Sequence, residues 1–183
     1  MAVILLGGGA RSGKSSYGLR YVEQRFASGV FVATGEAGDD EMRERIERHK
    51  AERGPFWRTV EEPLDLAGAL RREAETAEAI LVDCLTLWLS NVLLDPAGDE
   101  EVRIDELVGL LRGWDGPTMA LVTNEVGCGI VPMNELSRRF RDLAGAMNQR
   151  VAEVADEVYW LAFGLPLRLK PQPGGAEGGS PWV

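Results

Sequence analysis

The chain has 183 residues, of which 45% are hydrophobic and 27% charged, proportions typical of one globular domain with a sizeable core. Its formal net charge of -9 and pI near 4.8 disfavour a nucleic-acid-binding protein, because such proteins normally carry a basic surface. We therefore expect no nucleic-acid partner.

The cysteines and the apolar stretches exclude further classes of protein. Cys84 and Cys128 lie far apart among apolar residues and glycine, which favours reduced, buried thiols over a disulfide framework or a CxxC metal site. The N-terminus lacks the basic segment of a signal peptide, and the longest uncharged stretch, 84–94, is too short to span a bilayer. We expect a cytoplasmic protein without a membrane span.

A glycine-rich motif follows the first predicted strand, 3–6. Residues 8–15 read GGARSGKS and match G-x-x-x-x-G-K-[ST], in which backbone N–H groups and a helix N-terminus bind phosphate. We expect Lys14 to meet the β- and γ-phosphates and Ser15 to offer its hydroxyl to Mg²⁺. The rest of the loop is predicted to bind nucleotide mainly through its backbone: Gly8, Gly9, Ala10, Arg11, Ser12 and Gly13. The motif indicates a nucleoside triphosphate without specifying a reaction.

Further strand-like runs alternate with helical patterns along the chain, at 30–34, 79–83, 119–123 and 158–161. This alternation predicts an α/β fold with a mostly parallel central sheet covered by helices, and the phosphate loop makes it a P-loop NTPase fold. A last strand, 167–170, follows the short link 163–166 and is expected to form a hairpin at the sheet edge.

The domain boundary is expected near residue 170. Residues 1–170 are predicted to form a single catalytic domain. Residues 171–183 read PQPGGAEGGSPWV, a composition with little to bury, which predicts a flexible tail.

One carboxylate stands at the end of a predicted strand. The run ILVD at 80–83 ends in Asp83, which is typical of the second half of a P-loop site, where the acid holds Mg²⁺ or its water shell. Together with the hydroxyl of Ser15, Asp83 is therefore a candidate metal ligand.

The only histidine, His49, lies in the highly charged segment 39–53, which reads DDEMRERIERHKAER. Acidic residues at its start and Gly54 after its end predict a helix, with His49 on the same face as Met42 and Ile46. Two apolar residues bury a helix poorly, and the flanking cations suit a polyphosphate. On these residues alone, a functional histidine and a core histidine both remain open.

Residues 123–132, TNEVGCGIVP, read as a strand end followed by a glycine-bearing loop, where open α/β sheets bind ligands. A helix is predicted to begin at Asn134. Its apolar stripe consists of Leu136, Phe140, Leu143, Met147, Val151 and Val154. Its arginines are candidates for binding a phosphorylated substrate or for a solvated surface: Arg138, Arg139 and Arg141.

Taken together, these motifs resemble the bifunctional adenosylcobinamide kinase/adenosylcobinamide-phosphate guanylyltransferase family of cobalamin biosynthesis. The resemblance runs through 8–15, 32–35, 39–53, 57–63, 82–91 and 124–149. Its most specific part is the element NEVGxGIVP joined to RFRDxxGxxNQ, which occurs together with an R-I-x-x-H helix.

The resemblance implies two reactions. In the first, ATP or GTP phosphorylates the hydroxyl of the aminopropanol arm of adenosylcobinamide. In the second, GTP forms a covalent guanylyl-histidine with loss of pyrophosphate, and GMP then passes to adenosylcobinamide phosphate to give adenosylcobinamide-GDP. A neutral imidazole is a competent nucleophile for such a step.

The resemblance also implies which residues serve these reactions. The matched histidine is His49, which joins Lys14 as a catalytic residue. The family's nucleotide contacts fall on residues 8–15, on Ala33, Thr34 and Gly35, on Lys50, Ala51, Glu52 and Arg53, and on Glu61 and Asp83. The family is RecA-like and typically homotrimeric, and the apolar patch at 84–94 suits either a core or a subunit interface.

Two alternatives share the phosphate loop. Another small-molecule or nucleoside monophosphate kinase would use the loop and Asp83 but leave His49 without a role. A nucleotide-dependent switch or assembly subunit would use the triphosphate to change conformation. Neither alternative predicts a covalent nucleotide, whereas the family resemblance does.

Overall fold

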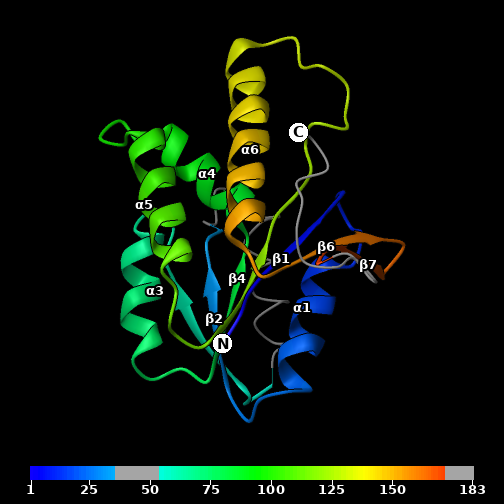
Figure 1. Ribbon diagram of the computed structural model, residues 1–183. Coiled ribbons are helices and arrows are strands. Elements are labelled where there is room, and N and C mark those ends of the chain that lie inside the picture. The colour runs from blue at the N-terminus through cyan, green and yellow to red at the C-terminus, as the bar shows by residue number, and fades with distance from the viewer. Residues whose placement is uncertain (36–53, 172–183) are drawn as a thin grey trace.

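A seven-stranded sheet forms the centre of the computed structural model, which describes residues 1–35 and 54–171 (Figure 1). The strand order is β3-β2-β4-β5-β1-β6-β7. Strands β1 to β6 run parallel and β7 pairs antiparallel with β6. The mostly parallel sheet that the sequence predicts is therefore present.

The elements of the described residues have the following bounds. The strands are β1 Val3–Gly8, β2 Gly29–Ala33, β3 Trp57–Glu61, β4 Ala79–Asp83, β5 Thr118–Val122, β6 Glu157–Ala162 and β7 Leu165–Lys170. The helices are α1 Lys14–Glu23, α3 Leu66–Ala74, α4 Leu85–Leu94, α5 Glu100–Arg112 and α6 Glu135–Val154. None of these helices is long and apolar enough to cross a membrane.

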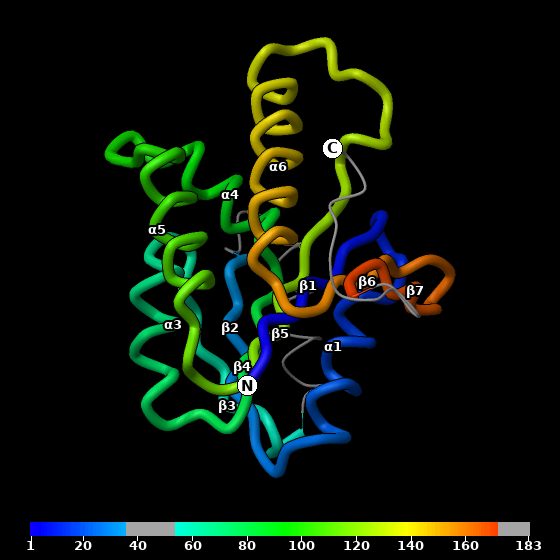
Figure 2. The backbone as a smooth tube through the Cα atoms, viewed as in Figure 1, coloured from blue at the N-terminus to red at the C-terminus, as the bar shows by residue number. Residues whose placement is uncertain are grey.

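Helices cover both faces of the sheet (Figures 1 and 2). The strand side chains alternate between two apolar layers, one on each face. Ile80 and Val82 of β4 join the layer that contains side chains of α3, α4, α5 and α6. Leu81, between them, joins Leu6 and Val22 in the layer beneath α1. Because Asp83 is two residues after Leu81, this alternation places it on the α1 side of the sheet.

Strand β3 was not predicted from the sequence. It lies at the edge of the sheet beside β2, with Trp57 buried and Arg58, Thr59 and Glu61 exposed. An edge strand with exposed side chains needs no continuous apolar run, and the segment WRTVE has none. The charged residues Arg58 and Glu61 break the apolar pattern by which the other strands were predicted.

The predicted hairpin at the other edge is confirmed, but its predicted boundary was wrong. The turn consists of Phe163 and Gly164 alone, and β7 begins at Leu165 rather than Leu167. Pro166 lies within β7, where an edge position tolerates its missing N–H group. Because proline usually interrupts a strand, the sequence pattern assigned Leu165 and Pro166 to the link instead of to β7.

The helix predicted from Asn134 is α6. The side chain of Asn134 caps it by accepting a hydrogen bond from the N–H of Ser137 at 2.7 Å. Its stripe is buried at Met147 and Val151, but Leu136 is exposed. Figure 1 shows the reason, since the first turns of α6 project beyond the sheet.

The apolar patch at 84–94 corresponds to α4 and contributes mainly to the core. Leu85, Trp88, Leu89 and Val92 are buried against the sheet and the neighbouring helices. Leu94, at the end of the helix, remains exposed. The sequence pattern had assigned this apolar patch either to the core or to a subunit interface. Most of its side chains belong to the core.

The two cysteines differ, so the prediction that both are buried was wrong for Cys128. Cys84 is buried, and burial together with the neighbouring charge of Asp83 raises the pKa of its thiol to about 11. Cys128 is exposed because its loop, residues 124–134, extends away from the sheet (Figure 2).

This difference predicts selective alkylation. Iodoacetamide at pH 8 should label one thiol in each folded chain, at Cys128, because the thiolate is the nucleophile and Cys84 is buried with a raised pKa. Mass spectrometry of peptides before and after unfolding in urea measures the result. Labelling of Cys84 as fast as Cys128 in the folded protein would contradict the described core.

Candidate active site

The carboxyl ends of four parallel strands bring predicted site residues to one edge of the sheet. Ala33 of β2 is the register partner both of Glu61 in β3 and of Asp83 in β4. Side chains of register partners share a face of the sheet, so the two carboxylates flank Ala33 on the α1 side. The phosphate loop leaves the same edge at Gly8, the end of β1.

Two glycines of the phosphate loop have backbone conformations and contacts that exclude other residues. Gly8 has φ 149°, and a Cβ there would lie 2.5 Å from the carbonyl oxygen of Leu161 in β6. Gly13 has φ 96°, and a Cβ there would lie 2.9 Å from the Cα of Gly164. The motif therefore has glycine where the loop passes close to β6 and to the β6–β7 turn.

Lys14 is the first residue of α1, and its side chain lies within the loop. Its ammonium donates to the carbonyl of Gly9 at 2.6 Å and to Ser12 Oγ at 3.4 Å. The residue is only 6% exposed, and this burial lowers the pKa of Lys14, while its electrostatic interactions with the acidic groups of Cys84 and Asp83 oppose the shift. The ammonium of Lys14 and the N-terminus of α1 therefore both place positive charge at the phosphate loop.

A buried threonine fixes the ends of β2 and β4 to each other. Thr34 Oγ1 donates to the carbonyl of Cys84 at 2.7 Å and accepts from the N–H of Cys84 at 2.8 Å. The side chain of Asn91 in α4 donates to the carbonyl of Thr34 at 2.7 Å and to that of Pro63 at 3.3 Å. These bonds hold the backbone directly after Asp83 and directly after Ala33.

A second polar group fixes the end of β5. Thr123 Oγ1 donates to Asn148 Oδ1 of α6 at 2.7 Å, and the amide of Asn148 donates to the carbonyl of Asn124 at 3.2 Å. The N–H of Asn124 in turn donates to Thr86 Oγ1 of α4 at 2.8 Å. The N–H of Glu125 reaches the carbonyl of Gly8 at 3.1 Å, so this group also contacts the start of the phosphate loop.

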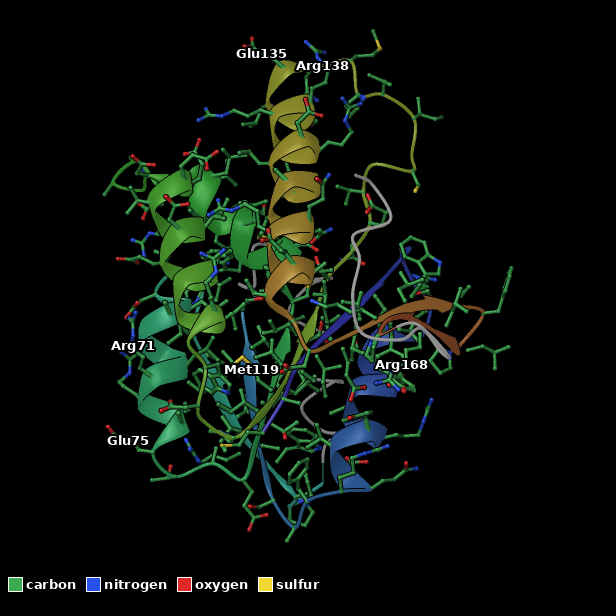
Figure 3. The ribbon with its side chains drawn as sticks, in the orientation of Figure 1. Arg71, Glu75, Met119, Glu135, Arg138 and Arg168 are labelled. Carbon is green, nitrogen blue, oxygen red and sulfur yellow. The ribbon has the colours of Figure 1, made fainter. Side chains whose placement is uncertain are left out.

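We call residues 124–134, together with the first turns of α6, the arm. Arg138 ties it together by donating to the carbonyls of Pro132 at 3.1 Å and Met133 at 2.6 Å, near the label of Arg138 in Figure 3. Ile130 and Met133 point away from the protein, 96% and 98% exposed. The arm thus projects an apolar surface.

The other two candidate arginines, Arg139 and Arg141, contact carboxylates. Arg139 pairs with Glu100, and Arg141 pairs with Asp142 at 2.8 Å. Together with the carbonyl contacts of Arg138, these pairs favour a structural role on the described surface. The sequence had left two roles open for these three arginines, binding of a phosphorylated substrate and a place on a solvated surface.

The structure brings together most of the predicted site. The phosphate loop, the end of β2, Glu61 and Asp83 share the carboxyl edge. His49 and the predicted contacts at 50–53 lie outside the described residues, as does the tail beyond Pro171. Sequence reasoning missed Asn91 and Asn148, whose side chains hold the ends of β2 and β5. Each is a polar amide on the inward side of its helix, a position that can be recognised only when the orientation of α4 and α6 is known.

The donor chemistry at this edge fits Mg²⁺. A hydroxyl at Ser15 and a carboxylate at Asp83 are the hard oxygen ligands this ion prefers. Within residues 1–35 and 54–171 no group of three or more His, Cys, Asp or Glu side chains could hold a metal ion. Mg²⁺ bound by one or two protein oxygens takes its other ligands from water and substrate phosphate.

Comparison with known proteins gives a consistent assignment. A family model described as cobinamide kinase / cobinamide phosphate guanyltransferase matches residues 4–169. The bifunctional adenosylcobalamin biosynthesis protein CobP of Pseudomonas aeruginosa is 47% identical over 174 residues, covering 92% of this chain and 98% of that protein. The corresponding CobU of Escherichia coli K12 is 35% identical, covering 92% and 99%.

Solved structures resemble the chain in fold. The ATPase EscN of the enteropathogenic E. coli type III secretion system superposes with TM-score 0.58 at 14% identity, covering 88% of this chain and 43% of that one. A prototypical type III secretion ATPase of pathogenic bacteria gives TM-score 0.52 at 12% identity, covering 87% and 50%. These likenesses, with the strand order and loop described above, confirm the predicted α/β P-loop fold.

The contact between Gly13 and Gly164 predicts a loop-specific defect. Gly13→Ala introduces a Cβ at positive φ and 2.9 Å from Gly164 Cα, so nucleotide affinity should fall at least about tenfold. Gly9→Ala is the matched control, because a Cβ at Gly9 meets nothing within 4 Å. Isothermal titration with GTP measures both affinities, and equal affinities would show that the close approach at Gly13 is unimportant.

Proposed function

The chain belongs to the cobinamide kinase / cobinamide phosphate guanyltransferase family, and we propose that it carries out both reactions of a bifunctional enzyme of adenosylcobalamin biosynthesis. It phosphorylates adenosylcobinamide with ATP or GTP, and it then transfers GMP from GTP to adenosylcobinamide phosphate, giving adenosylcobinamide-GDP. The observation that carries this proposal is the phosphate loop at the same edge of the sheet as Asp83, with Lys14 buried in the loop and interacting electrostatically with that carboxylate.

In the kinase step, this chain binds and orients the triphosphate. Backbone N–H groups of residues 8–13 and the α1 N-terminus hold the phosphates, and Lys14 exchanges its bond to Gly9 for the β- and γ-phosphate oxygens. Ser15 and Asp83 would hold Mg²⁺, which neutralises charge on those oxygens when bound. The substrate hydroxyl then attacks the γ-phosphorus, and the nucleoside diphosphate leaves.

In the guanylyl step, His49 is the proposed nucleophile. Its imidazole nitrogen attacks the α-phosphorus of GTP, a P–N bond forms, and pyrophosphate leaves. A phosphate oxygen of adenosylcobinamide phosphate then attacks the same phosphorus, and the P–N bond breaks to regenerate the histidine. The place of Gly35, directly after β2 at the carboxyl edge, supports this role because the segment that carries His49 begins there.

The remaining nucleotide contacts are also proposals. Strand β2 ends at Ala33, and Thr34 and Gly35 follow it at the carboxyl edge of the sheet. Glu61 is the register partner of Ala33. These positions support contact with a nucleotide bound at that edge. Residues 50–53 are proposed from the family resemblance alone. We further propose that both reactions occur in the cytoplasm, where ATP and GTP are available, and involve no nucleic acid.

We also propose that the chain assembles as a homotrimer. The support from the described residues is the apolar surface of the arm and of β7, where Ile130, Met133, Leu165 and Leu167 are exposed. Association between copies would remove such surface from water. Sedimentation equilibrium measures the stoichiometry directly.

The two half-reactions should separate in a His49→Ala variant. Protein labelling by α-³²P GTP and formation of adenosylcobinamide-GDP should disappear, because no other histidine exists in the chain. Phosphorylation of adenosylcobinamide should persist, since that transfer needs the phosphate loop rather than a protein nucleophile. The wild-type linkage should be labile to acid and stable to alkali, as expected of a phosphoramidate.

Lys14→Ala is the comparison variant, and it should lower both activities by about 10²-fold or more because it removes the cation at the transferring phosphates. Retained guanylylation in His49→Ala would refute the histidine assignment. A wild-type protein that never takes up α-label would instead favour a simple kinase or a nucleotide-dependent switch.

The metal assignment predicts altered ion dependence. Ser15→Ala and Asp83→Asn should each require a higher Mg²⁺ concentration for half-maximal kinase activity, because the first removes a hydroxyl ligand and the second replaces a charged carboxylate by a neutral amide. Ser16→Ala is the matched control, since Ser16 neighbours Ser15 but is exposed on α1. Magnesium titrations that are identical for all four proteins would exclude both residues from the metal site.

A further inference from the structure

The β6–β7 turn contacts the phosphate loop directly. The N–H of Gly164 donates to the carbonyl of Ser12 at 2.9 Å, and Gly13 approaches Gly164 so closely that no Cβ fits between them. The turn also has short strands on both sides, with Ala162 paired to Leu165. Its position relative to the loop is therefore fixed by the backbone.

The other residue of the turn, Phe163, is 99% exposed. Both turn residues have positive φ, 55° for Phe163 and 78° for Gly164, a conformation for which asparagine or aspartate followed by glycine is the usual choice. A phenylalanine at positive φ is disfavoured, and its exposed ring buries nothing within the described residues. Neither turn geometry nor core packing explains an aromatic side chain here.

The strand order shows on which side of the phosphate loop the β6–β7 turn lies. Asp83 ends β4, and the sequence β4-β5-β1-β6-β7 places β4 and the β6–β7 turn on opposite sides of β1. In the proposed function, the γ end of a bound triphosphate faces the side of Asp83, where Lys14 would meet its charge and the carboxylate would hold Mg²⁺. The nucleoside therefore extends toward the other side, where the turn stands.

We propose that Phe163 is the platform on which the purine base of the bound nucleotide stacks. This inference rests on the proposed function, because it needs a nucleoside triphosphate in the phosphate loop. An exposed aromatic ring stacks on the face of any purine, so the contact adds affinity without distinguishing ATP from GTP. It supplies a binding residue outside the phosphate loop itself, and it gives the strained residue a role.

The test compares nucleotides with a ligand that has phosphates but no base. Phe163→Asn keeps a residue that tolerates positive φ and removes the ring, whereas Phe163→Tyr keeps the ring. Leu165→Ala is the matched control, because it removes an exposed apolar side chain from the same hairpin. Isothermal titration with GTP, ATP and inorganic tripolyphosphate measures the affinities of all four proteins.

Phe163→Asn should weaken GTP and ATP by a similar factor, about tenfold, and leave tripolyphosphate unchanged. Phe163→Tyr and Leu165→Ala should bind all three ligands as the wild type does. Equal nucleotide affinity in Phe163→Asn and wild type would overturn the proposal. So would an equal loss of tripolyphosphate, which would mean that the turn only shapes the loop.

Two further outcomes are distinguished by the same proteins. If the wild type binds tripolyphosphate but neither nucleotide, the proposed function itself fails, independently of Phe163. If sedimentation equilibrium shows that Phe163→Asn changes the oligomeric state, the ring serves an interface between copies, and the base-stacking proposal is wrong.

Discussion

The close approach of the phosphate loop to β6 and to the β6–β7 turn is the constraint on which the site depends. Gly8 lies against the carbonyl of Leu161, and Gly13 lies against Gly164, so the loop is held at both ends by backbone rather than by side chains. A loop fixed in this way presents its N–H groups without reorganising, which is the condition for strong electrostatic binding of phosphate. The hairpin is thus part of the phosphate site, although it contributes no residue to the motif.

A second set of contacts fixes the opposite side of the site. The hydroxyl of Thr34 both donates to and accepts from Cys84, and the hydroxyl of Thr123 donates to Asn148 of α6. Buried polar groups cost free energy unless they are paired, and here Thr34 pairs with the backbone directly after Asp83 while Asn148 pairs with the backbone directly after Thr123. These hydrogen bonds hold the ends of β2, β4 and β5 in a single conformation, and with them the backbone of Asp83.

How much of this the sequence could predict depends on whether a signal is local. The loop at 8–15, the strand ending at Asp83 and the capped helix after Asn134 each follow from a short pattern, and the structure contains all three. Strand β3 and the exposure of Cys128 depend on position in the sheet and on the reach of the arm, which no window of sequence contains. The contact between Gly164 and Ser12 joins residues far apart in the chain, so it too needed the fold.

Two reactions on one phosphate loop require that different phosphorus atoms of a triphosphate meet different nucleophiles. In the proposed kinase step, the loop and Lys14 would bind the β- and γ-phosphates and Asp83 would hold Mg²⁺, an arrangement that would orient the γ-phosphorus for attack. The proposed guanylyl step attacks the α-phosphorus, which lies nearer the nucleoside, so the orientation of the nucleoside decides whether that atom is presented. A base platform at the β6–β7 turn would fix this orientation from one end while the loop fixes the other. In this proposal, the segment that carries His49 and the bound corrinoid would then determine which of the two reactions takes place.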